Sequence, residues 1–289
     1  MKNVEKIFAP MNPHFVGDGF RVHSYIPGYP ALNQKRMDPF LLLDYNSKYV
    51  FPPSEIPKGV GVHPHKGFET VTLAYHGRVE HGDSSGGGGV IAEGDIQWMT
   101  AGKGVLHKEF HETEWSKQGG LFQMIQLWVN LPAKYKTVEP KHQALANKDL
   151  KKFELTDGSG IVEVIAGHYQ GTSGIAETFS PIEMYNLKAK SGATATFTIP
   201  ANYNTFVLVL DGEIEINGTE VVKENHLALM KNDGDIFTIK VQQDAVVFIA
   251  GGEPINEPIV HYGPFVMNTE EEIRQAIHDF QSGKFGNLN

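Results

Sequence analysis

The chain has 289 residues, more than the roughly 100 to 200 residues of one domain, so two domains of about half the length each are expected. It carries 25 Lys and Arg against 34 Asp and Glu, and this net charge of −9 argues against a large nucleic-acid surface, which depends on clustered basic side chains. Because the chain lacks cysteine, disulfides, zinc–thiolate sites and cysteine nucleophiles are excluded, and redox chemistry must depend on a metal or an organic cofactor.

The sequence shows no sign of membrane insertion. The N-terminal residues lead into no apolar stretch of the kind that signal peptides carry. No uninterrupted apolar run approaches the ~18 residues that a transmembrane helix needs. We therefore expect a cytoplasmic protein without membrane partners.

The first strands are expected before residue 50. Residues 20–26 (FRVHSYI) alternate between apolar and polar in the manner of a strand. Residues 39–45 (PFLLLDY) form a short apolar run, which is typical of a buried strand. Prolines at positions 52, 53 and 57 then predict an irregular segment.

Two short strings follow, HPH at residues 63–65 and HKE at residues 107–109. Side chains at i and i+2 of a strand share a face, so His63 and His65 point one way together, and so do His107 and Glu109. If the two strands lie side by side in a barrel with these faces inward, three imidazoles and one carboxylate meet around one divalent transition metal. One HPH string alone is as typical of a solvated strand face as of a metal site, and the second string favours the metal site.

Further turn-punctuated strands are expected at residues 68–75, 95–99 and 121–131, and such a series indicates an all-β barrel or sandwich. The glycine-rich segment at residues 84–89 (SSGGGG) lacks the Gly-Lys-Ser/Thr sequence and the following helix of a phosphate loop. We interpret it as a flexible hairpin tip near the metal site.

Residues 134–155 are polar and predict a linker between an N-terminal domain at residues 1–133 and a C-terminal domain at residues 156–289. Strand patterns resume after the linker in a set of similar size, which indicates a tandem repeat of one β fold. Where the first half has HPHKGFETVTLAYHG, the second has ANYNTFVLVLDG, so both histidine positions of the repeat are empty. We therefore expect one metal site, in the N-terminal half.

One helix is predicted near the C-terminus. Residues 269–272 (TEEE) form a capping box, in which the first and last side chains each bind a backbone N–H of the other. Ile273, Ala276, Ile277 and Phe280 follow at helical spacing, and Gly283 can end the helix. The apolar stripe is expected to pack on a barrel.

Taken together, five motifs spread over nearly the whole chain resemble the pirin family of bicupins. They are DPFLLLD (38–44), HPHKGFETV (63–71), GDIQWMTAGKG (94–104), LWVNL (127–131) and GPFVMNT (263–269). The resemblance implies two tandem cupin barrels, of the double-stranded β-helix or jelly-roll type, with iron in the N-terminal one. The expected fold is thus all-β, with a C-terminal α-helix.

The resemblance places the family's metal ligands on His63, His65, His107 and Glu109. In the general cupin pattern the carboxylate comes a few residues after the HPH string, which here is Glu69. A bulge at Gly67 would leave the facing of Glu69 open. The pirin-type match favours Glu109 as the ligand and leaves Glu69 beside the site, and either carboxylate could be the catalytic base.

Three imidazoles and one carboxylate leave two octahedral positions open for substrate and dioxygen. This donor set fits Fe(II), and Mn, Co, Ni and Cu are alternative occupants. Because some pirins resemble quercetin 2,3-dioxygenases, the resemblance implies a ring-cleaving dioxygenase of flavonol-like polyphenols. In that reaction Glu109 or Glu69 would take the proton of the substrate hydroxyl.

Two other functions stay open. Some pirins resemble protein partners of transcription factors or metabolic enzymes, which implies a non-enzymatic regulator that responds to the iron oxidation state through the tip at residues 86–89. A small-molecule-binding barrel with a structural metal is the third, and the open coordination positions disfavour it. Near the pocket we expect His111, either inside it or at its rim, and at its mouth Phe40, Trp98, Met99 and Phe110, which are each more typical of a core.

Overall fold

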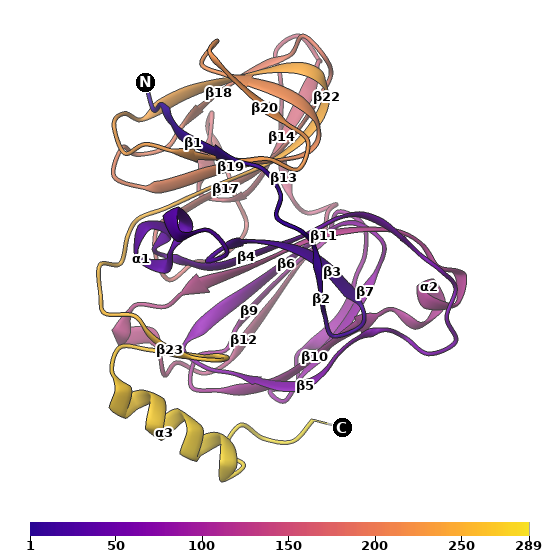
Figure 1. Ribbon diagram of the computed structural model, residues 1–289, viewed down its shortest axis with the longest axis vertical. Coiled ribbons are helices and arrows are strands. Elements are labelled where there is room, and N and C mark those ends of the chain that lie inside the picture. Colours follow the sequence, from indigo (N-terminus) through magenta and orange to yellow (C-terminus); the bar gives the residue numbers. More distant parts are fainter. Residues whose placement is uncertain (289) are drawn as a thin grey trace. The chain divides into compact units, whose positions relative to one another are not determined.

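The computed structural model of the protein describes residues 1–288, which form mostly β-strands together with three α-helices (Figure 1). The chain divides into two compact units that interleave along the sequence. The unit called here the first barrel comprises residues 12–35, residues 40–147 and the chain from residue 255. The second barrel comprises residues 1–11, 36–39 and 148–254.

The first barrel is built on two antiparallel sheets. The larger has the strand order β12-β9-β6-β11-β4-β3-β2, and the smaller has the order β5-β10-β7-β8. The strands predicted at residues 20–26, 68–75 and 95–99 form here as β3, β6 and β9, with limits that agree within one residue. The strands are β2 (His14–Val16), β3 (Phe20–Ile26), β4 (Phe40–Phe51), β5 (Gly59–His65), β6 (Phe68–His76), β7 (Val79–Asp83), β8 (Gly88–Ile91), β9 (Ile96–Thr100), β10 (Val105–His111), β11 (Gly120–Asn130) and β12 (Lys141–Leu145).

The C-terminal helix α3 (Glu270–Gln281) belongs to the first barrel. Its predicted capping box forms, with Thr269 accepting from the backbone of Glu272 while the Glu272 side chain reaches back. Ile273 and Ala276 pack with residues of β24 (Phe265–Met267), and Figure 1 shows the helix beside β23 (Val260–Tyr262). The remaining short elements are η1 (Pro30–Leu32), α1 (Gln34–Met37), α2 (Thr113–Gln118) and η2 (Ala133–Tyr135).

The second barrel is organised around a nine-stranded antiparallel sheet whose central strands are β19 and β22. Its interior is filled by apolar side chains such as Phe197, Phe237 and Ile249, which are buried completely. The strands are β1 (Val4–Phe8), β13 (Lys151–Glu154), β14 (Gly160–Ala166), β15 (His168–Tyr169), β16 (Thr172–Ser173), β17 (Ile182–Ala189), β18 (Thr194–Thr198), β19 (Asn204–Ile216), β20 (Glu220–Lys223), β21 (Leu227–Met230) and β22 (Ile236–Gly252).

The compact units differ from the predicted ranges 1–133, 134–155 and 156–289. Strand β1 pairs with β21, so the first residues of the chain belong to the second barrel. The segment predicted as a linker is divided between two sheets, because β12 pairs with β9 and β13 pairs with β14. The hydrophobic pattern of a strand does not show which sheet the strand joins, because a strand can pair with any sheet that has a free edge.

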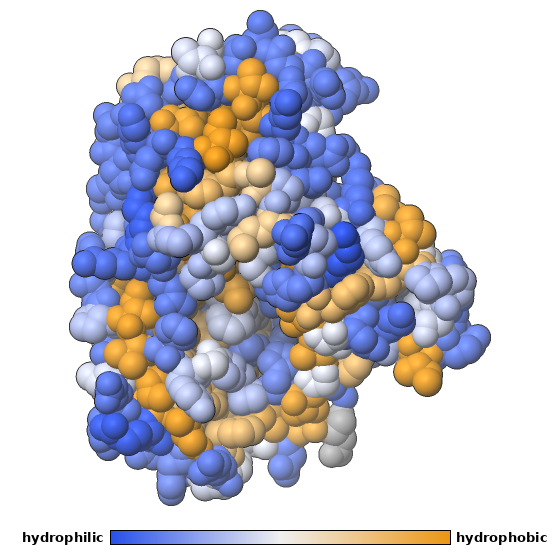
Figure 2. Space-filling model, in the orientation of Figure 1, coloured by the Kyte–Doolittle hydropathy of each residue, from blue (hydrophilic) through white to orange (hydrophobic). Residues whose placement is uncertain are grey.

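The surface shows no large continuous apolar area on the face drawn in Figure 2, where apolar residues form separate patches among hydrophilic ones. Scattered apolar patches of this kind are normal for globular proteins. None of the helices formed by residues 1–288 is long and apolar enough to cross a membrane.

Candidate metal centre

The histidines predicted as ligands lie on two paired strands of the smaller sheet. β5 and β10 run antiparallel, with His63 directly opposite His107 and His65 opposite Val105. The register shifts between His107 and Glu109, which marks a β-bulge or irregularity in β10. A bulge next to a site commonly redirects a side chain. Here the irregularity lies between His107 and Glu109, the two ligands predicted on β10.

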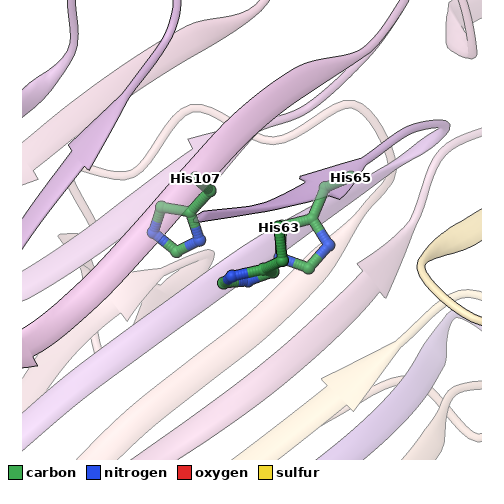
Figure 3. Close-up of side chains that lie close together, drawn as sticks. All are labelled: His63, His65 and His107. Atoms are coloured by element: carbon green, nitrogen blue, oxygen red, sulfur yellow. The ribbon is translucent and has the colours of Figure 1, made fainter. Parts of the chain in front are cut away.

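Three imidazoles converge at this point, as Figure 3 shows. One ring nitrogen of each of His63, His65 and His107 lies within 4.8 Å of the others, and the Nε2 atoms of His63 and His65 are 3.0 Å apart. Ligand nitrogens of one ion lie about 2 Å from it, and therefore within about 4 Å of each other. The three side chains could thus hold one divalent metal ion.

The electrostatics of the cluster favour neutral imidazoles. Burial lowers the pKa of His107 to about 3, and burial together with the neighbouring histidines lowers the pKa of His65 well below its usual range. Neither ring nitrogen of His107, nor Nδ1 of His65, has a hydrogen-bond partner among the described residues. Since unpaired buried polar atoms cost about 1–3 kcal/mol each, neutral rings with unused lone pairs fit a metal ion well.

Glu109 lies beside this cluster. Its Oε1 is 3.9 Å from Nε2 of His107, and it stands outside the tight group of three imidazoles. Thr72 donates to Oε1 at 3.2 Å and Gln126 donates to Oε2 at 2.8 Å. These two hydrogen bonds fix the direction of the carboxylate, so Glu109 is oriented within reach of whatever the histidines bind.

Glu69, the other predicted base, is placed elsewhere. It is three residues from Thr72 on β6, so its side chain points to the opposite face of the strand. There it accepts a hydrogen bond from Thr100 at 2.8 Å, and it does not line the cavity at the histidines. The expectation that Glu69 could take a substrate proton is therefore corrected, because the strand turns it away from the site.

The buried Glu69 carboxyl makes stability depend on pH. Burial raises its pKa to about 7, against a partial offset from hydrogen bonds of Thr100 and Trp98. Because the pKa of Glu69 is higher in the folded protein, its contribution to the free energy of unfolding is complete below pH 4.5, the pKa in the unfolded chain. This contribution is lost as the pH rises to about 7. The Glu69→Gln variant lacks this titration, so its stability relative to wild type should be about 3 kcal/mol higher at pH 8 than at pH 4.5. Urea unfolding of both proteins at the two pH values measures this difference, and parallel pH profiles would contradict it.

A cavity of about 280 Å³ opens at the histidines. It lies within the first barrel, between the strands that carry His63, Glu109 and Gln126. Its walls are mostly apolar, as is usual for small-molecule sites. The lining residues are Val16, Phe20, Val22, Asp44, Asn46, Val60, His63, His65, Glu109, Met124, Gln126, Trp128 and Pro264.

The other residues expected near the pocket lie outside this lining. His111 is buried, its Nε2 is 2.8 Å from the backbone oxygen of Gly19, and it packs edge-on against Phe51, so it is part of the core. Phe40, Trp98 and Met99 are buried core residues, and Phe110 is not in the lining either. Because the strand register was unknown, sequence patterns could not identify which apolar side chains face the cavity.

Several side chains around the three histidines and Glu109 give no signal in the sequence. Thr72 and Gln126 hold Glu109, but β6 and β11 carry them at ordinary strand positions. His142, in the segment expected as a linker, stacks on His81 with the two Nε2 atoms 3.0 Å apart. These partners become visible only when β6 pairs with β11, and β12 with β9.

The buried ammonium group of Lys136 binds the backbone just after the HPH string. Lys136 is buried, and its Nζ donates to the carbonyl oxygens of Gly67 at 2.8 Å and Val266 at 2.9 Å and to Oδ1 of Asn130 at 2.7 Å. The side chain therefore joins the turn between β5 and β6 to β11 and β24.

The Lys136→Met variant should be strongly destabilised. Methionine fills a similar volume but leaves three buried oxygens without their donor, which predicts a loss of about 3 kcal/mol in the free energy of unfolding. Urea unfolding followed by circular dichroism measures this loss. The exposed Lys134 offers the matched control, since Lys134→Met should change stability by less than about 0.5 kcal/mol. Equal effects of the two substitutions would contradict the structural role.

Sequence profiles of two protein-family domains match the chain. The profile named Pirin matches residues 19–129, and the profile named Pirin C-terminal cupin domain matches residues 184–286. The two matches fall on different halves of the sequence, as the predicted tandem repeat requires.

Individual proteins match over almost the full length. A Pseudomonas aeruginosa protein named "Putative quercetin 2,3-dioxygenase PA2418" is 44% identical over 285 residues, which is 99% of both chains. Human pirin is 38% identical and covers 93% of this chain and 89% of its own length. A crystal structure of quercetin 2,3-dioxygenase from Acinetobacter baumannii matches with a TM-score of 0.94 at 46% identity, over 100% of both chains.

Proposed function

Because the chain belongs to the pirin family of bicupins, we propose that it is an iron-dependent dioxygenase that cleaves flavonol-like polyphenols. The observation that carries the proposal is the convergence of three imidazoles, of which those of His65 and His107 are buried, at a cavity of about 280 Å³ with mostly apolar walls. The names of the Pseudomonas aeruginosa and Acinetobacter baumannii relatives support the reaction and the substrate class.

His63, His65 and His107 would hold the ion, with Glu109 as the fourth ligand. Nitrogen and oxygen donors without sulfur suit Fe(II), and the same donors accept Mn, Co, Ni or Cu. When bound, the ion supplies Lewis acidity toward the flavonol 3-hydroxyl and a binding position for dioxygen.

The residues of the cavity position the flavonol. Phe20, Val22 and Trp128 offer apolar surface to a flat ring and exclude water from it. Glu109 faces the same cavity, and Gln126 and Thr72 fix the direction of its oxygens. In this arrangement Glu109 takes the proton of the 3-hydroxyl, and proton transfer by a positioned group contributes about 10²- to 10⁴-fold to rate.

The test uses the iron-loaded protein under anaerobic conditions. Quercetin is added first, its binding is followed by absorbance, and air is then admitted while oxygen uptake and carbon monoxide release are measured. We expect one dioxygen consumed and one carbon monoxide released for each flavonol cleaved, with both oxygen atoms entering the organic product. Binding without oxygen uptake would contradict the dioxygenase and favour the redox-responsive regulator.

A further inference from the structure

Two polar side chains of the cavity wall have no part in the proposed reaction. Asp44 and Asn46 are two residues apart on β4, so both point to the face that lines the cavity. Across the sheet, Asp44 pairs with Gln126 and Asn46 pairs with Met124. Gln126 already donates to Glu109, so Asp44 and Asn46 are the acidic and amide side chains of the lining that the proposed reaction leaves without a role.

Asn46 is in an unusual state for a buried amide. It is 1% exposed, yet neither its Oδ1 nor its Nδ2 has a hydrogen-bond partner among residues 1–288. Buried polar side chains are paired in the large majority of cases, and an unpaired one calls for a specific reason. On a cavity wall, a ligand that brings the missing donor and acceptor supplies that reason.

Asp44 complements this amide. Ser24 donates to its Oδ1 at 2.5 Å, and the carboxyl lines the same cavity. Burial raises the pKa of Asp44, against a partial offset from the hydrogen bond of Ser24, and its carboxyl oxygens can accept hydrogen bonds from a ligand. The Asn46 amide can both donate and accept, so the two side chains together suit hydroxyl groups, which also do both.

We propose that Asp44 and Asn46 form a recognition edge for two adjacent hydroxyl groups on an aromatic ring of the substrate. A phenolic hydroxyl both donates and accepts, which matches the amide of Asn46 and the carboxyl of Asp44. Side chains at i and i+2 of a strand share a face, so Asp44 and Asn46 can both turn toward one ring that lies against that face. Phe20, Val22 and Met124 cover the ring itself. This inference rests on the proposed function and narrows its substrate class to catechol-bearing flavonols.

The test compares two flavonols with the same 3-hydroxyl. Quercetin carries two adjacent hydroxyls on its outer ring, and galangin carries none there. Binding to the iron-loaded protein is titrated without oxygen, so the result does not depend on turnover. The wild type should bind quercetin about 10-fold more tightly than galangin, and Asn46→Leu should weaken quercetin binding by about 10-fold while galangin binding stays within about 2-fold.

Thermal unfolding of the ligand-free protein gives a second readout. Leucine replaces two unpaired polar atoms by an apolar group of similar size, so Asn46→Leu should raise the melting temperature while it weakens quercetin binding. Asn46→Asp keeps the size of the side chain but removes its hydrogen-bond donor. It should also weaken the binding of quercetin more than that of galangin. Met124→Leu, on the neighbouring strand position, is the matched control and should shift both flavonols by the same factor.

Each other outcome counts against the recognition edge. Equal affinity of the wild type for the two flavonols, or an equal loss for both in Asn46→Leu, would overturn it and leave the proposed dioxygenase intact. Failure of the wild type to bind either flavonol would contradict the proposed function and this inference together.

Discussion

Replacing His107 with alanine should lower the affinity for Fe(II) by about 100-fold or more and abolish flavonol turnover, since even residues that only support metal ligands contribute 10- to 100-fold. His107 is buried completely, lies opposite His63 on the neighbouring strand, and has two ring nitrogens without a hydrogen-bond partner among residues 1–288. The substitution removes one of three convergent imidazoles, and the remaining two hold an ion less tightly. Competition with a chelator of known affinity measures the loss.

The matched control for this variant is His142→Ala. His142 is also a partly buried imidazole of the first barrel, but it pairs with His81 and lies outside the three-histidine group. Its iron affinity should stay within about 3-fold of wild type, since no metal ligand is lost. Wild-type iron affinity in His107→Ala, or an equal loss in both variants, would contradict the assignment.

The second large effect is expected for Glu109→Gln, which should reduce turnover by about 10²- to 10⁴-fold. Glutamine has the same shape, and Thr72 and the amide of Gln126 can turn to re-form both hydrogen bonds, so the fold is retained. The amide, however, cannot accept the substrate proton. Steady-state oxygen uptake with quercetin measures the loss.

Iron affinity separates the two roles of Glu109. If the carboxylate is a metal ligand, Glu109→Gln also weakens Fe(II) binding, by about 10-fold or more, whereas a base alone leaves it within about 3-fold. Glu80→Gln serves as the control, because Glu80 is exposed on β7 of the same sheet and should leave turnover unchanged. Full turnover in Glu109→Gln would show that neither role applies.

The histidine cluster was predictable because its geometry is local. The i, i+2 spacing fixes which side chains share a face of a strand, and that rule placed His63 and His65 together. Pairing His107 with them required only that the two strands be neighbours, which β5 and β10 are. The capping box at Thr269 was readable for the same reason, since all its partners lie within one helical turn.

The rest of the site depends on contacts between strands far apart in the sequence. Glu69 and Thr72 lie close together in the chain, yet opposite faces of β6 separate Glu69 from the site and bring Thr72 to Glu109. Gln126 reaches Glu109 from β11, and Asn46 reaches the cavity from β4, because of a register that no single strand encodes. The exchange of β1 into the second barrel is non-local in the same way.

The most direct test of the account is anomalous diffraction at the iron edge from crystals of the Fe(II)-loaded protein. The account predicts a strong peak about 2 Å from one ring nitrogen each of His63, His65 and His107 and from a carboxylate oxygen of Glu109. A peak that lies elsewhere, or the absence of any peak between β5 and β10 in crystals that contain stoichiometric iron, would contradict it.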